Sequence, residues 1–73
     1  MTNREWLMSL TNKQLAEFLT FGIMVRNLNY HTDAFRVSIH DIARQYTSST
    51  LGVELWLSAT QEYMIEKGGE DDG

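Results

Sequence analysis

The chain has 73 residues, no cysteine and a formal net charge of −4 at pH 7. This length allows a single domain with a small core, and the lack of cysteine excludes disulfides and thiolate metal sites as sources of stability. No run approaches the roughly 20 apolar residues of a membrane-spanning helix, and the polar start lacks the basic and then apolar pattern of a signal peptide. We therefore expect a soluble protein that works in the cytoplasm.

Residues 2–19 predict two short helices joined almost without a loop. Thr2 with Glu5, and Thr11 with Gln14, have the spacing of a capping box, in which each side chain bonds to the backbone N–H of the other residue. Two such start signals in close succession indicate a helical hairpin. We expect its core to be formed by Trp6, Leu7, Leu10, Leu15, Phe18 and Leu19.

Alternating apolar residues after the helical hairpin predict strands. Gly22 is placed to end the hairpin in a left-handed conformation. Residues 23–28 and residues 34–37 alternate and are separated by turn-forming residues 29–33, so we expect the two segments to pair as a β-hairpin. Residues 61–66 alternate again and predict an edge strand that pairs with one of the first two.

Two further helices are predicted between these strands. Ser38 and Asp41 repeat the capping-box spacing, and the hydroxyl-rich residues 47–50 end the third helix and begin the fourth. The apolar face of the third helix would consist of Ile39, Ile42, Ala43 and Tyr46, and that of the fourth of Leu51, Val53, Leu55, Trp56 and Leu57.

These elements predict an α-rich α+β fold with four short helices, two of them N-terminal and two central, and a small two- or three-stranded sheet. We expect a single compact domain over residues 1–67. Residues 68–73 contain no apolar side chain, and we expect them to form a disordered acidic tail.

The sequence offers little for catalysis or metal binding. His31, Asp33, His40 and Asp41 form a grouping with metal-ligand character, but it supplies only two nitrogen ligands, and Asp41 is assigned to a helix cap. Ser38, His40 and Asp41 are the residue types of a hydrolase triad, yet such near neighbours at a helix start point to different faces. We therefore expect no catalytic, cofactor-binding or metal site, and no enzyme.

Negative charge is concentrated toward the C-terminus. An acidic surface disfavours general nucleic-acid binding, because contacts with phosphates dominate that affinity. It suits either simple solvation or a basic protein partner, and one form of the latter is a surface that mimics phosphates in the basic groove of a nucleic-acid enzyme. The acidic set consists of Glu54, Glu62, Glu66, Glu70, Asp71 and Asp72. The expected partner-binding residues are Glu54, Glu62, Glu66 and Asp71, with Tyr30 and Tyr63 as aromatic anchors.

Two alternatives stay open. Arg26, Arg36 and Arg44 would make a basic patch, to which Tyr30 and Tyr46 would add the aromatic surface that binds single-stranded nucleic acid. The protein would then be a small nucleic-acid-binding regulator. Self-association through surplus apolar surface would instead make it a structural protein and a homo-oligomer.

Two blocks near the ends of the chain resemble small proteins from phages and prophages of Firmicutes. Residues 3–7 (NREWL), 9–10 (SL) and 15–19 (LAEFL) are similar to their opening, NREWLxSLxxxxLAxFL. Residues 54–57 (ELWL) and 61–63 (QEY) are similar to their closing Trp-Leu pair and Glu-Tyr ending. Many of these proteins carry cysteine pairs of zinc-binding type in the middle. This chain has none, so zinc is not carried over.

Some small phage proteins of this kind are anti-CRISPR inhibitors. The resemblance therefore implies a phage-encoded protein that binds and inhibits a component of host defence. An anti-CRISPR protein that blocks an RNA-guided DNA nuclease through an acidic surface is the leading expectation. Its partner would be a host protein with a basic surface in the bacterial cytoplasm, and neither a membrane nor a cofactor is implied.

Overall fold

Four helices and three strands follow one another in the part of the chain that the computed structural model describes, residues 1–30, 33–46 and 50–66. The predicted α-rich α+β fold is confirmed. The expected acidic tail at residues 68–73 lies outside the described residues. The elements are α1 (Asn3–Met8), α2 (Asn12–Phe18), β1 (Ile23–Asn27), β2 (Phe35–Val37), α3 (Ile39–Gln45), α4 (Thr50–Ser58) and β3 (Tyr63–Ile65).

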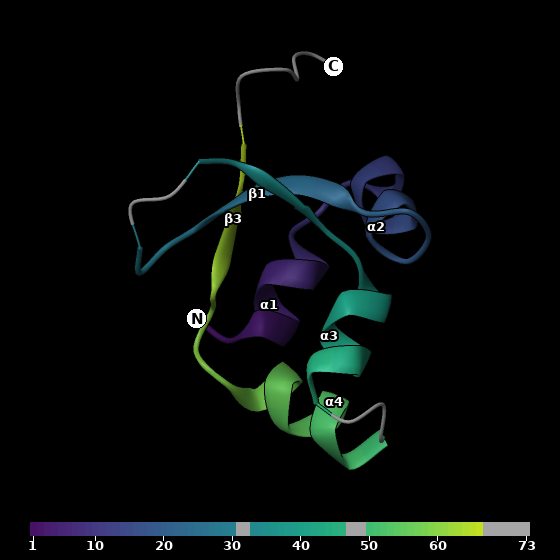
Figure 1. Ribbon diagram of the computed structural model, residues 1–73, viewed down its shortest axis with the longest axis vertical. Coiled ribbons are helices and arrows are strands. Elements are labelled where there is room, and N and C mark those ends of the chain that lie inside the picture. Colours follow the sequence, from purple (N-terminus) through teal and green to yellow (C-terminus); the bar gives the residue numbers. More distant parts are fainter. Residues whose placement is uncertain (31–32, 47–49, 67–73) are drawn as a thin grey trace.

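The three strands form an antiparallel sheet in the order β2-β1-β3 (Figure 1). Val25 in the centre of β1 lies opposite Phe35 of β2 and Ile65 of β3. The predicted hairpin is confirmed, and the third predicted strand pairs with the first one at an edge. Because successive side chains of a strand point to opposite faces, β1 buries Ile23 and Val25 and exposes Met24.

One face of the sheet is covered by helices, and the other is open. In Figure 1, α1, α3 and α4 gather on the same side of the sheet, whereas α2 lies next to the start of β1. α4 contacts both α1 and α3. We call the other side the open face of the sheet; the exposed side chains Met24, Arg26, Arg36 and Met64 point from it.

The core is rich in aromatic rings. Phe18 is fully buried between two tryptophans, with its ring centre 6.0 Å from that of Trp6 and 6.2 Å from that of Trp56. Such ring pairs stabilise a small core beyond the burial of their area. Leu7, Leu10, Ile39 and Tyr46 are partly buried against the core, as predicted. The buried members are Trp6, Phe18, Ile23, Val25, Val37, Ile42, Trp56 and Tyr63.

Three leucines that the sequence assigns to apolar faces are exposed instead. Leu19 is 49% exposed because α2 ends at Phe18 and Leu19 forms its C-cap, where the chain turns away from the core. Leu51 and Leu55 of α4 are 62% and 61% exposed. The inward side of α4 is occupied by Trp56, so the wide apolar face that the sequence predicts is only partly covered.

The three predicted capping boxes are present. In the first, the hydroxyl of Thr2 accepts from the backbone N–H of Glu5, and the Thr2 N–H donates to the Glu5 carboxylate at 2.7 Å. Each box satisfies backbone N–H groups that the start of a helix leaves without a partner. The pairs are Thr2 with Glu5, Thr11 with Gln14, and Ser38 with Asp41.

Two of these caps should make stability depend on pH. The backbone N–H of Thr2 holds the pKa of Glu5 below its ordinary 4.5, and that of Ser38 holds the pKa of Asp41 below 3.8. A carboxyl whose pKa is lower in the folded state contributes stability that is present above the unfolded pKa and lost as pH falls through the folded one. We therefore expect the melting temperature to fall below about pH 4.5.

Thermal unfolding between about pH 7 and about pH 2.5 checks this. The variant carrying both Glu5→Gln and Asp41→Asn keeps neutral acceptors at the caps and should lose less stability over the same interval. An identical loss in the parent and the double variant would contradict the assignment.

Candidate functional site

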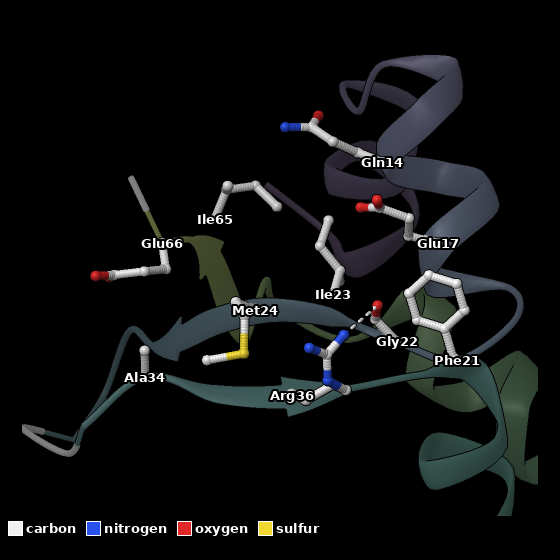
Figure 2. Close-up of a pocket in the computed structure, with 10 residues that line it drawn as sticks. All are labelled: Gln14, Glu17, Phe21, Gly22, Ile23, Met24, Ala34, Arg36, Ile65 and Glu66. Carbon is white, nitrogen blue, oxygen red and sulfur yellow. Dashed lines mark hydrogen bonds between the residues drawn. The ribbon is translucent and has the colours of Figure 1, made fainter. Parts of the chain in front are cut away.

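A groove of about 560 Å³ lies between α2 and the end of the sheet where β1 begins and β3 ends (Figure 2). We call it the α2 groove. Ile23 and Ile65 give it apolar walls, and Figure 2 shows Gln14 and Glu17 reaching from α2 toward them. Phe21, which is 68% exposed, lies at one end. The α2 groove thus combines apolar surface with polar groups from a helix, the composition of a binding site.

Glu17 is the charged group that α2 contributes to this groove. Its side chain is half-buried, and no hydrogen bond or ion pair to its carboxylate occurs within the described residues. Gln14, one helical turn earlier, uses its amide oxygen to accept from the Thr11 N–H at 2.9 Å, so its NH2 group is the end that remains for a ligand. α2 therefore presents an anion and a hydrogen-bond donor side by side.

Arg36 forms the opposite side of the α2 groove. Its Nη1 donates to the carbonyl of Gly22 at 3.2 Å, and its guanidinium carbon lies 5.8 Å from the centre of the Phe21 ring. The second contact has the geometry of a cation–π interaction. Arg36 is thus held against its own chain, at the point where the chain passes from α2 into β1.

The other two arginines of the expected basic patch are in ion pairs. Arg26 lies 2.5 Å from the carboxylate of Glu66, and Arg44 lies 2.6 Å from that of Asp41. Arg26 and Arg36 share the open face of the sheet, whereas Arg44 lies on α3. The structure therefore brings two of the three arginines onto one surface and gives all three a partner within the chain.

The expected acidic surface is divided. Glu54 is exposed on α4, and Glu66 directly follows β3; Figure 1 shows α4 and the end of β3 at opposite ends of the long axis. Glu62 is half-buried, and its carboxylate accepts from the indole N–H of Trp56 at 3.0 Å. The described members of the set therefore do not share one face. Glu70, Asp71 and Asp72 lie outside the described residues.

The two expected aromatic anchors differ in exposure. Tyr30 is 67% exposed beyond the end of β1 and is open to a partner. Tyr63 is 5% exposed, with its ring centre 6.0 Å from that of Trp6 and 5.7 Å from that of Phe35. Burial raises the pKa of Tyr63 to about 12, so the phenol stays neutral. Tyr63 is a core residue, because β3 turns it toward the helices, and it offers a partner no surface.

Of the residues weighed for metal binding and catalysis, those that the structure describes are either used in a helix cap or exposed to solvent. Within the described residues, no three His, Cys, Asp or Glu side chains are placed to hold a metal ion, and His31 lies outside them. Ser38 and Asp41 bond to each other in a capping box, and His40 is exposed. None of the described helices has the length and apolar content that crossing a membrane requires.

Comparison with known proteins adds no relative: no family model, curated protein or solved structure matches the chain. Function therefore has to be inferred from the surface of this fold. Among the described residues, the α2 groove and the open face of the sheet both combine apolar and charged side chains.

Sequence reasoning missed the α2 groove. The sequence pattern predicts Gln14 and Glu17 to be helix-forming or capping residues. It predicts Ile23 and Ile65 to be strand residues, which are far apart in the chain. The one available signal was a charged residue at position 17, on a helix whose neighbouring positions are apolar.

Proposed function

We propose that this protein is a phage-encoded inhibitor that acts by binding a component of host defence, and that its target is an RNA-guided DNA nuclease. One observation carries the binding role. Arg26, Arg36 and Arg44 are engaged within the chain, whereas the carboxylates of Glu17 and Glu54 have no polar partner among the described residues. Together with a net charge of −4, carboxylates without a partner favour a basic target, and the groove that holds nucleic acid in a nuclease is basic.

The open face of the sheet supports the same role. Met24 and Met64 are 39% and 40% exposed on it, beside two arginines. Methionine, arginine and aromatic residues are enriched in the cores of protein interfaces. The resemblance of the two ends of the chain to small phage proteins supports the origin of the protein and the class of its target. Such an inhibitor would act in the cytoplasm of the infected cell.

A nucleic-acid-binding regulator has less support. Binding of phosphate by Arg26 or Arg44 would have to compete with an existing ion pair, and Arg36 would have to leave the Gly22 carbonyl. A gel-shift measurement with a random DNA pool at low salt separates the two proposals. The inhibitor is expected to leave the DNA unshifted.

A self-associating structural protein is the second candidate. Leu51 and Leu55, one turn apart on α4, form an exposed apolar stripe that favours it. Sedimentation over a range of concentrations tests this candidate, because a stripe that drives assembly gives a mass that rises with concentration. A monomer at every concentration rules it out.

A cleavage assay tests the inhibitor directly. A panel of guide-loaded RNA-guided DNA nucleases from Firmicutes is mixed with the protein in increasing molar ratio, and cleavage of a matched DNA target is followed. Cleavage by at least one nuclease should stop near stoichiometric ratio, with a complex detected by size-exclusion chromatography. Undiminished cleavage by the whole panel, with no complex, would remove the nuclease as the target.

A further inference from the structure

We propose that the α2 groove binds an arginine or lysine side chain presented by the target protein. The aliphatic stem would lie along Ile23 and Ile65, and the cationic head would pair with the carboxylate of Glu17. The identity of the target rests on the proposed function, whereas the chemistry of the bound side chain rests on the groove itself.

The walls of the groove match the two halves of such a side chain. Arginine and lysine bury an aliphatic stem while their charged head seeks a polar partner. Both isoleucines line the groove, but Ile23 is only 6% exposed and Ile65 is half-buried, so Ile65 supplies most of the apolar surface that they offer to a ligand. Figure 2 shows the Glu17 carboxylate extending from α2 over this surface. A stem on the isoleucines would therefore bring its head to the carboxylate.

The environment of Glu17 calls for a cation. Its side chain is half-buried, and a carboxylate gains a strong hydrogen bond from an ionised partner. The described cation that lines the groove is Arg36, and it donates to the Gly22 carbonyl and lies over Phe21. The groove thus contains a carboxylate with which no cation of the described residues forms an ion pair.

An anionic ligand does not fit the same groove. Besides Arg36, the ionised groups that line it are the carboxylates of Glu17 and Glu66, of which the second is already paired with Arg26. Gln14 adds an NH2 donor one turn from Glu17, because its oxygen is used by the helix cap. That donor suits a backbone carbonyl next to the bound side chain. The occupant is therefore a residue within a peptide segment rather than a free anion.

Peptide titration followed by NMR tests the inference on the full chain. The probe is acetyl-Gly-Leu-Arg-Leu-Gly-amide, and its matched control carries citrulline, which has nearly the shape of arginine without the charge. The arginine peptide should shift the amide signals of residues 17, 23 and 65 in a saturable way. The citrulline peptide should bind roughly fivefold more weakly or worse, as expected for a half-exposed charge-assisted contact.

The matched protein variants are Glu17→Gln and Glu54→Gln. Both remove one carboxylate that has no polar partner among the described residues, but Glu54 lies on α4, away from the α2 groove. Glu17→Gln should weaken binding of the arginine peptide about fivefold, and Glu54→Gln should leave it unchanged. If Glu17→Gln failed to fold, the comparison of arginine and citrulline peptides on the parent protein would still decide.

Three results would overturn the inference. They are equal binding of the two peptides, equal binding by the parent and Glu17→Gln, and shifts confined to α4. Shifts at residues 17, 23 and 65 upon concentrating the protein alone would assign the groove to a second copy of the chain instead. Failure of the proposed function is distinguishable. Peptide binding at the groove without inhibition of any nuclease would contradict the nuclease as the target. Equal inhibition by the parent and Glu17→Gln would contradict a role of the groove in inhibition.

Discussion

Replacing Asn3 with alanine is expected to lower the free energy of unfolding by about 2–3 kcal/mol, because the change removes two hydrogen bonds of a buried side chain and leaves the Glu62 N–H without its partner. Asn3 is 1% exposed. Its Nδ2 donates to the carbonyl of Trp56 at 2.7 Å, and its Oδ1 accepts from the N–H of Glu62 at 3.0 Å. The backbone N–H of Asn3 also donates to the carbonyl of Ala59 at 2.9 Å. One side chain therefore joins the start of α1 to the end of α4 and the approach to β3.

Asn12→Ala is the matched control for this prediction. Asn12 is the first residue of α2, as Asn3 is of α1, and each follows the threonine of a capping box. Asn12 is exposed, so its replacement should change stability by about 0.5 kcal/mol or less. Urea unfolding followed by tryptophan fluorescence measures both variants. Similar losses in the two would show that the buried hydrogen bonds of Asn3 contribute little.

Gly22→Ala is expected to lower the free energy of unfolding by about 2–3 kcal/mol, from backbone strain and crowding together. Gly22 has a φ of 110°, a conformation that side chains with a Cβ rarely adopt. An added Cβ would lie 2.7 Å from Cγ of Arg36 and 3.0 Å from the carbonyl oxygen of Val37. Because the Gly22 N–H donates to the carbonyl of Glu17 at 2.7 Å, the strain would fall on the passage from α2 to β1.

A double variant separates the two causes. Arg36→Ala removes the nearer of the crowding atoms but changes neither the φ of Gly22 nor the carbonyl of Val37. The variant with both Gly22→Ala and Arg36→Ala should therefore recover part of the stability lost, relative to Arg36→Ala alone. Urea unfolding provides the comparison. A loss below about 0.5 kcal/mol for Gly22→Ala would contradict the requirement for glycine.

Elements specified by near neighbours were predictable from the sequence. Each capping box depends on residues three positions apart. Thr2 with Glu5 and Ser38 with Asp41 therefore predict where their helices begin, without knowledge of the fold. The β-hairpin follows from alternation within two short runs. In these cases the free energy that specifies the structure is local.

Features specified by distant partners were not predictable. The burial of Asn3 depends on Trp56 and Glu62, more than fifty positions away in the chain. Arg26 meets Glu66 across the strand pair of β1 and β3, and this pairing takes one of the expected binding carboxylates into an ion pair. Helical periodicity places Leu51 on the apolar face of its helix, but it does not predict how much of that face the neighbouring helices cover.

The α2 groove is also specified by residues that are distant in the chain. The α2 groove exists because α2 lies against β1 and because β3 ends beside the start of β1. The sequence predicts the helix and both strands but not their packing. It therefore does not predict that Glu17 lines a groove. Conversely, the sequence predicts an acidic surface from composition alone, whereas the described carboxylates lie on different parts of the fold.

The affinity of the protein for the proposed target, an RNA-guided DNA nuclease, tests the proposed mode of action most directly when it is measured by calorimetry at about 0.1 M and about 0.5 M salt. Carboxylates that meet a basic surface should give a tight one-to-one complex at the lower salt concentration. The dissociation constant should rise about tenfold or more at the higher concentration, because salt screens exposed charges. A dissociation constant that does not change with salt, or no binding at the lower concentration, would contradict an electrostatic inhibitor.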